Sequence, residues 1–148
     1  MYLISGCLLG HNCKYNGGNN RSEKVVDFAS ERSFLAVCPE GCSGLPVPRP
    51  PAEFAGERIV DREGRDVTEA FRRGAELSLR QALEEAERRG EKIEGAILKA
   101  NSPSCGSGRI YDGTFSGRLK EGYGCFAEML YKRGIKVISE KEIDNDKF

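Results

Sequence analysis

This sequence has no net charge, a single histidine and no long apolar run. Its 148 residues include 23 Lys and Arg against 23 Asp and Glu, so the formal net charge at pH 7 is zero. This balance argues against a strongly basic nucleic-acid-binding surface and against a polybasic membrane anchor. No apolar run approaches the about 18 residues that a membrane-spanning helix needs. We therefore expect neither nucleic acid nor a membrane among the partners.

Cysteine, by contrast, is well represented, with six residues in the chain. The first ten residues are apolar but have no basic leading region, and the chain turns polar at His11 and Asn12, so no secretory leader is indicated. We expect a cytoplasmic protein, and disulfides are rare in the cytoplasm. The six cysteines are therefore expected to bind metal or to take part in chemistry rather than to form disulfides.

Length and composition predict one globular domain over residues 1–148. Hydrophobic residues make up 39% of the chain and charged residues 31%, a composition typical of folded proteins. Short apolar runs predict four strands, at Tyr2–Ser5, Ser33–Val37, Gly95–Leu98 and Ile135–Ile138. Helical periodicity predicts three helices: two turns capped by Ser22, a long helix capped by Thr68 and ended by Gly90, and a helix at about Gly124–Arg133.

The alternation of these strands and helices predicts the fold class. Apolar strands separated by helices are typical of a parallel sheet that is covered on both faces. We predict an α/β fold: a three-layer Rossmann-like domain with a mostly parallel sheet of about four strands. Between these elements we expect two long loops, Pro39–Gly56 and Ala100–Gly117, and a small hairpin that pairs Glu57–Val60 with Arg65–Val67.

Three cysteines follow three of the predicted strands. Cys7 and Cys38 come directly after the first two strands, and Cys105 lies in the loop after the third. The carboxyl ends of parallel strands meet at one edge of a sheet, where open α/β sheets bind ligands. The three thiols could bind a soft metal or an iron–sulfur cluster, could be buried structural groups, or could be redox-active or nucleophilic. A zinc site has little support, because His11 is the only histidine and no Cys-x-x-Cys pair is present.

Polar residues near these thiols are candidates for supporting roles. Glu40 lies two residues after Cys38, and a carboxylate beside a metal can act as a general acid or base. Cys13 could be a fourth ligand or a spectator thiol. Arg49 lies on a proline-stiffened loop, where it could bind an anionic or carbonyl group or pair with an acid such as Glu53.

Two further segments are candidates for contacts with a ligand. Ser102 and Ser104 place hydroxyl groups next to Cys105 in the sequence. The glycines of Asn16–Gly18 and Gly106–Gly108 let backbone N–H groups approach a ligand closely.

A set of motifs in this order resembles the domain-of-unknown-function 523 family, some of whose members are thiouracil desulfidases. The resemblance covers nearly the whole chain and is specific for the family more than for one substrate. The motifs lie at Ser5–Gly18, Val37–Glu40, Gly44–Glu53, Asp66–Thr68 with Phe71, Ile97–Lys99, Ser102–Gly106 and Ile110–Gly113.

The resemblance implies a cofactor and a set of site residues. It implies a 4Fe–4S cluster bound by Cys7, Cys38 and Cys105, with one iron left open, and it makes Cys13 a spectator. It also implies that Glu40 is the catalytic acid or base and that Ser102 assists it. Substrate contacts are assigned to Ser104, Tyr15, Asn16, Gly17 and Arg49.

The function expected on this basis is a non-redox desulfidase. The open iron would act as a Lewis acid on the sulfur of a thiolated pyrimidine such as 2-thiouracil, or of another thioamide. Glu40 would activate water, and hydrosulfide would be released. The alternative hypotheses are a non-catalytic iron–sulfur or sulfide-carrier module in thionucleoside metabolism, and a structural domain with zinc-bound or reduced thiols. A monomer or small homo-oligomer is expected.

Overall fold

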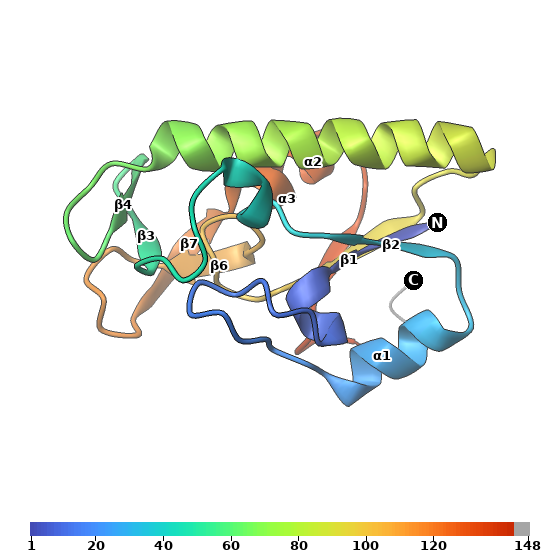
Figure 1. Cartoon of the computed structure of the whole chain (residues 1–148), viewed down its shortest axis with the longest axis horizontal. Coiled ribbons are helices and arrows are strands. Elements are labelled where there is room, and N and C mark those ends of the chain that lie inside the picture. Colours follow the sequence, from blue (N-terminus) through green and yellow to red (C-terminus); the bar gives the residue numbers. More distant parts are fainter. Residues whose placement is uncertain (144–148) are drawn as a thin grey trace.

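A four-stranded parallel sheet forms the centre of the computed structural model, which describes residues 1–143 (Figure 1). The strands follow the order β2-β1-β5-β8. All three pairs of neighbours are parallel, so the predicted parallel sheet is confirmed. The four strands are β1 (Tyr2–Ser5), β2 (Phe34–Val37), β5 (Gly95–Leu98) and β8 (Val137–Ser139).

Helices cover both faces of this sheet, as the apolar strands require. The long α2 (Thr68–Arg89) and α3 (Cys125–Lys132) lie on one face, and α1 (Glu23–Ser30) lies on the other (Figure 1). Two buried clusters result, one between the sheet and α2 with α3, the other between the sheet and α1. The predicted three-layer, Rossmann-like α/β fold is therefore confirmed.

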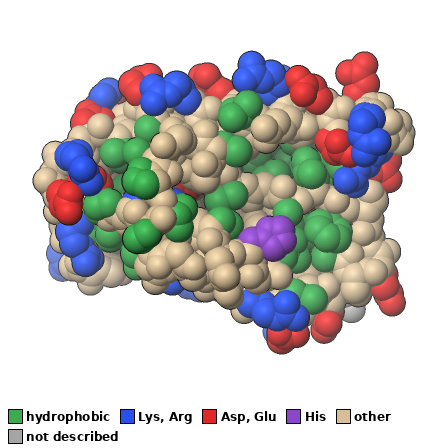
Figure 2. Space-filling model, in the orientation of Figure 1, with side chains coloured by type: hydrophobic (Ala, Val, Ile, Leu, Met, Phe, Trp, Pro, Cys, Tyr) green, Lys and Arg blue, Asp and Glu red, His purple; other side chains and the backbone are tan. Residues whose placement is uncertain are grey.

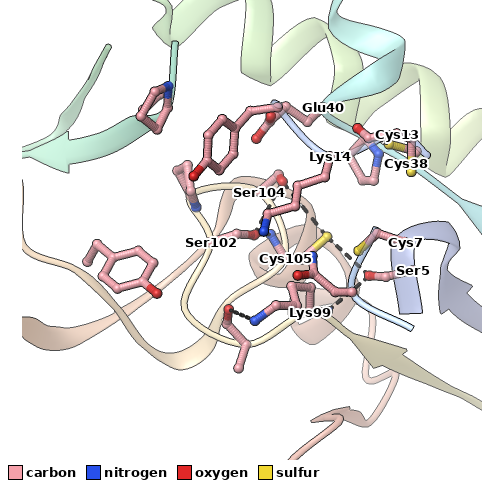
Figure 3. Close-up of a pocket in the computed structure, with 18 of the residues that line it drawn as sticks. Ser5, Cys7, Cys13, Lys14, Cys38, Glu40, Lys99, Ser102, Ser104 and Cys105 are labelled. Atoms are coloured by element: carbon pink, nitrogen blue, oxygen red, sulfur yellow. Dashed lines mark hydrogen bonds between the residues drawn. The ribbon is translucent and has the colours of Figure 1, made fainter. Parts of the chain in front are cut away.

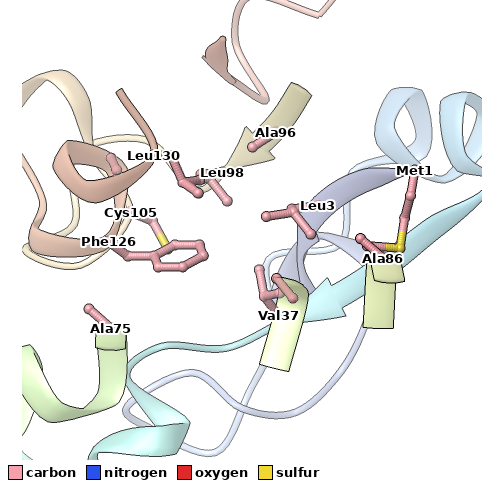
Figure 4. Close-up of a cluster of buried hydrophobic side chains, with 12 residues drawn as sticks. Met1, Leu3, Val37, Ala75, Ala86, Ala96, Leu98, Cys105, Phe126 and Leu130 are labelled. Carbon is pink, nitrogen blue, oxygen red and sulfur yellow. The ribbon is translucent and has the colours of Figure 1, made fainter. Parts of the chain in front are cut away.

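The larger cluster joins residues that are distant in the sequence. Leu3, Leu98 and Phe126 are fully buried in it, and Cys105 belongs to the same cluster. Figure 4 shows Cys105 beside Phe126, with Leu98 from β5 close by. Cys105, a candidate ligand, is therefore packed in the hydrophobic core, and this packing restricts the movement of its side chain.

The strand order places a ligand crevice between β1 and β5. The chain runs from β1 to β2 on one side and later adds β5 on the other, so the connections diverge at the carboxyl end of β1. Open α/β sheets bind ligands at such a switch point. The register pairs Ser5 with Val37 and Ile4 with Ile97, so the three strands end at nearly the same level.

Two antiparallel hairpins extend beyond the sheet. One pairs β3 (Ala52–Ala55) with β4 (Arg58–Asp61), and the other pairs β6 (Ser107–Tyr111) with β7 (Leu119–Tyr123). The predicted hairpin is present only as a short antiparallel contact, in which a bridge joins Val60 to Asp66 and the N–H groups of Val67 and Asp61 donate to the carbonyl oxygens of Ile59 and Arg65. The main ladder of the strand at residues 58–61 is instead with residues from the expected loop. Proline-rich flanks hid β3, and glycines weakened the pattern of β6 and β7.

The helix ends confirm one predicted cap and correct another. The Ser22 hydroxyl accepts a hydrogen bond from the Val25 N–H at 3.4 Å, as predicted. Thr68 does not cap α2, because its hydroxyl accepts the N–H of Ile59 at 2.8 Å. The carboxylate of Asp66 accepts the Thr68 N–H at 2.9 Å instead. Gly90 ends α2 with a φ of 66°, as expected for a glycine at this position.

Two short 3-10 helices follow the first two strands of the sheet. Gly6–Leu9 (η1) follows β1, so Cys7 lies in a helical turn. Gly41–Ser43 (η2) follows β2 and packs against α2 at Gly74. A Cβ on Gly74 would lie 2.1 Å from the carbonyl oxygen of Pro39. Only glycine therefore lets the helix approach the segment that contains Glu40.

The surface is mixed in charge. Lys, Arg, Asp and Glu side chains lie around the edges of the face shown in Figure 2, and the single histidine is exposed there. Within residues 1–143, no helix combines the length and apolar character that a bilayer crossing requires.

Candidate functional site

A pocket of about 420 Å³ opens where β1, β2 and β5 end. Cys7, Cys38 and Cys105 all line it, although they come from segments far apart in the sequence (Figure 3). Each of the three thiol groups interacts electrostatically with the other two. The convergence expected from the strand ends is therefore present in the fold.

Hydrogen-bond donors reach each of the three sulfurs. The Asn20 side chain bonds to the Cys7 thiol, and the Gly41 N–H donates to Cys38 Sγ at 3.3 Å. The Ser5 hydroxyl donates to Cys105 Sγ at 3.5 Å. Such donors favour the charged thiolate form, which is the form that binds metal.

Burial and hydrogen bonding shift the pKa values of these thiols in different directions. Burial raises the pKa of Cys7, and it raises the pKa of Cys105 to about 12. A hydrogen bond from the Cys13 thiol lowers the pKa of Cys38 to about 7, and the same bond raises the pKa of Cys13.

The other cysteines differ in their distance from the pocket. Cys13 lines the pocket beside Cys38 and interacts with Cys7 as well. Cys42 and Cys125 are not among the residues that line it. The Cys125 thiol donates to the Phe71 carbonyl oxygen at 3.5 Å and lies between α3 and α2. The two thiols outside the resemblance to the family are thus also outside the pocket.

Glu40 reaches the pocket as one half of an ion pair with Arg49. The Arg49 Nε atom donates to Glu40 Oε2 at 2.6 Å, and the side chains are 3% and 19% exposed for Arg49 and Glu40. Arg49 also donates to the carbonyl oxygens of Cys13 and Pro46, at 3.1 and 3.4 Å. All three nitrogens of its guanidinium group therefore bond to protein groups, and the predicted contact of Arg49 with substrate stays a prediction. The pairing with Glu53 considered above is not formed, because Glu53 accepts backbone N–H groups of the β6–β7 loop.

The two serines form a small network under Cys105. Ser102 Oγ accepts the Cys105 N–H at 2.8 Å and lies 3.5 Å from Ser104 Oγ. The Ser104 hydroxyl donates to Cys105 Sγ at 3.8 Å. Both serines line the pocket, so a hydroxyl hydrogen of Ser102 can turn toward a ligand while its oxygen holds the loop.

The glycine-rich segment is only partly at the pocket. Tyr15 lines it, whereas Asn16 and Gly17 do not. Asn16 is exposed, and its Oδ1 atom accepts the N–H of Gly18 at 2.9 Å. The Gly17 N–H donates to the Lys14 carbonyl oxygen at 2.9 Å. These groups close the turn that carries Tyr15 rather than reaching the pocket themselves.

Sequence reasoning missed several lining residues. Lys99 directly follows β5, so the rule that selected the cysteines could have found it. Its ammonium group pairs with Glu140 at 3.0 Å, which holds this cation beside the pocket. Lys14 lies within the motif at residues 5–18, but neither it nor Asn20 was selected as a site residue. Further lining residues that were missed are Ser5, Arg62, Tyr111 and Phe115.

Comparison with known proteins shows the family to which the chain belongs. The model of the 2-thiouracil desulfurase family matches residues 2–142. The chain belongs to the 2-thiouracil desulfurase family. This result confirms the resemblance noted in the sequence.

Two proteins similar to the chain support this family membership. The uncharacterized protein YbbK of Bacillus subtilis (strain 168) is 41% identical over 155 residues, which cover 98% of this chain and 99% of the relative. A solved structure of the 4Fe–4S-dependent thiouracil desulfidase TudS is 44% identical, with a TM-score of 0.80. That match covers 96% of this chain and 91% of the solved chain. Both matches cover nearly the whole length of this family member.

Proposed function

We propose that this protein is a desulfidase that removes sulfur from a thiolated pyrimidine with a 4Fe–4S cluster bound by Cys7, Cys38 and Cys105. The observation that carries this proposal is the convergence of the three thiols on one pocket at the switch point of the sheet. Family membership and the likeness to TudS support it. The pocket volume is in the range of small-molecule sites.

The donor set fits a cluster better than a single ion. Within residues 1–143, no three Cys, His, Asp or Glu side chains lie close enough together to hold one metal ion. A cubane binds its cysteines on different irons, so its ligands stand farther apart than the ligands of one ion. Three sulfurs around a partly buried pocket, each with a hydrogen-bond donor, suit that arrangement.

Three cysteine ligands leave one iron of a bound cluster free, and this iron supplies a Lewis acid that prefers soft sulfur donors. The chain's own residues then bind and orient the substrate. Tyr15 lines the pocket and provides an aromatic surface for a pyrimidine ring. Ser104 and Ser102 provide hydroxyl groups for its polar atoms.

Glu40 is the proton-transferring group in this proposal. Its Oε2 atom is held by Arg49, whereas Oε1 has no hydrogen-bond partner among residues 1–143. Oε1 can therefore accept a proton from a water molecule that attacks the carbon of the C–S bond. Water supplies the oxygen of the product carbonyl and sulfur leaves as hydrosulfide, so no net electron transfer is needed. Ser102 donates a hydrogen bond to the substrate during this step.

Anaerobic reconstitution tests the proposal directly. The reconstituted protein should bind iron and acid-labile sulfide, and it should bleach the absorbance of 2-thiouracil while releasing sulfide. The variants Cys7→Ser, Cys38→Ser and Cys105→Ser should each lose cluster binding. Cys42→Ser is the matched control, because its thiol lies outside the pocket. A protein that binds the full cluster and releases no sulfide from 2-thiouracil or other thiocarbonyl substrates would contradict the proposed activity.

A further inference from the structure

Ser5 is a buried hydroxyl that the proposed reaction does not use. It is the last residue of β1, a central strand of the sheet, and it is 3% exposed. Its oxygen accepts the Lys99 N–H at 3.0 Å, and its hydroxyl donates to Cys105 Sγ at 3.5 Å. Ser5 thus joins the ends of β1 and β5 to a sulfur 100 residues away in the sequence.

The backbone at this point determines the direction of the second bond. The pairing of β1 with β5 ends at Ile4 and Ile97, so the Lys99 N–H lies beyond the ladder of the sheet. The Ser5 oxygen accepts this N–H. A hydroxyl has only one hydrogen, and it cannot point at the N–H that its oxygen accepts. The hydrogen therefore points away from Lys99, and Cys105 Sγ is the acceptor within its reach.

Cys105 lies in the loop after β5 rather than in a regular element, and its side chain packs in the larger buried cluster. The bond from Ser5 adds a polar contact between the Cys105 sulfur and the sheet. Its other side-chain donor, Ser104, is in the same loop and is farther away, at 3.8 Å. Ser5 is therefore the donor that ties the Cys105 sulfur to the rigid sheet.

We propose that Ser5 is a positioning residue that holds the Cys105 sulfur in its ligand orientation and adjusts the reduction potential of the bound cluster. This inference rests on the proposed function, because it requires Cys105 to bind a cluster. Hydrogen bonds from neighbouring groups orient metal ligands, and hydrogen bonds to the sulfurs help to set cluster potentials. A donor withdraws electron density from the thiolate, so its removal disfavours the reduced cluster.

The experiment compares three variants of the reconstituted protein. Ser5→Ala removes the hydroxyl, and Ser5→Thr retains it. Ser78→Ala is the matched control, because Ser78 is also a buried serine but its hydroxyl has no hydrogen-bond partner among residues 1–143. The measurements are the reduction potential of the cluster and the rate of its loss to an iron chelator. Neither measurement requires turnover.

Ser5→Ala should lower the reduction potential and speed cluster loss on the order of fivefold, as expected for one lost hydrogen bond. Ser5→Thr and Ser78→Ala should match the parent protein. The inference is overturned if Ser5→Ala matches the parent, or if Ser5→Ala and Ser5→Thr change alike, including a shared failure to bind iron. A parent protein that binds no iron at all contradicts the proposed function instead, so the two failures are distinguishable.

Discussion

The Arg49 guanidinium and the Glu40 carboxylate form an ion pair at the wall of the pocket, with Nε and Oε2 2.6 Å apart. Arg49 is almost completely buried and also holds the backbone of the Cys13 loop. The pair therefore links the loop after β1 to the loop after β2. It fixes the one carboxylate that our proposal uses for proton transfer.

Glu40→Gln should abolish turnover while the cluster stays bound. The amide retains the size of the carboxylate but cannot accept a proton from water, and general acid–base groups contribute roughly 100- to 10,000-fold to rates. Steady-state desulfidation of 2-thiouracil, with iron content measured in parallel, checks this. Glu57→Gln, at an exposed glutamate in the turn between β3 and β4, is the control. Unchanged sulfide transfer by Glu40→Gln would favour a sulfide-carrier module over an enzyme.

Arg49→Lys should reduce both stability and turnover. Lysine retains the charge but cannot bond at once to Glu40 and to two backbone carbonyls, as Arg49 does. The loss of hydrogen bonds from a charged donor to these carbonyls costs about 1.5 to 3 kcal/mol, while the charge opposite Glu40 is retained. Denaturant unfolding gives the free energy of unfolding. Parental stability in Arg49→Lys would show that the guanidinium geometry is unimportant.

Gly74→Ala should separate α2 from the segment that contains Glu40. The added Cβ would lie 2.1 Å from the Pro39 carbonyl oxygen and 2.8 Å from the Ser43 nitrogen, so one of the two elements must move. We expect a destabilisation of about 1 to 3 kcal/mol together with lower turnover. Thermal unfolding and activity assays measure both.

Glu76→Ala, at an exposed position of the same helix, is the control for Gly74→Ala. It should change the free energy of unfolding by no more than about 0.5 kcal/mol. Equal stability of the two variants would contradict the close approach of α2 to the segment after β2.

The Asp66 carboxylate should stabilise the fold at neutral pH and lose this contribution at acidic pH. Hydrogen bonds from the side chain and backbone of Thr68, with a further bond from Arg58, lower the Asp66 pKa to about 2. A lowered pKa stabilises the fold above the unfolded-state value of about 4, and this contribution is lost as pH falls through about 2. Asp66→Asn should therefore lower the melting temperature at pH 7, and the difference should shrink between about pH 4 and pH 2.

Melting curves over this pH range test the role of Asp66. Asp27→Asn, at an exposed aspartate of α1, is the control and should follow the parent protein at every pH. A constant difference between Asp66→Asn and the parent from pH 7 to pH 2 would contradict the assigned role of the carboxylate charge.

Regular elements were predictable where local patterns were strong. The apolar runs at Tyr2–Ser5 and Gly95–Leu98 predicted strands correctly, because a strand buried on both faces is apolar throughout. The helical periodicity of α2 predicted the long helix correctly, because a helix buried on one face has apolar residues about every 3.6 positions. The pairing of β3 with β4 was not predictable. Short strands beside prolines have no strong pattern of their own, and their partners are chosen by packing.

Chain order and chemistry were sufficient to name the three thiols, the carboxylate and the serines as candidates that line one pocket, because strand ends in a parallel sheet meet at one edge. Long-range packing decided the rest. It joined Arg49 to Glu40 rather than to Glu53, left Asn16 and Gly17 outside the pocket, and brought Ser5 to Cys105 across 100 residues. Such contacts depend on how separate loops fold over the sheet, and no local pattern encodes the distance between two loops.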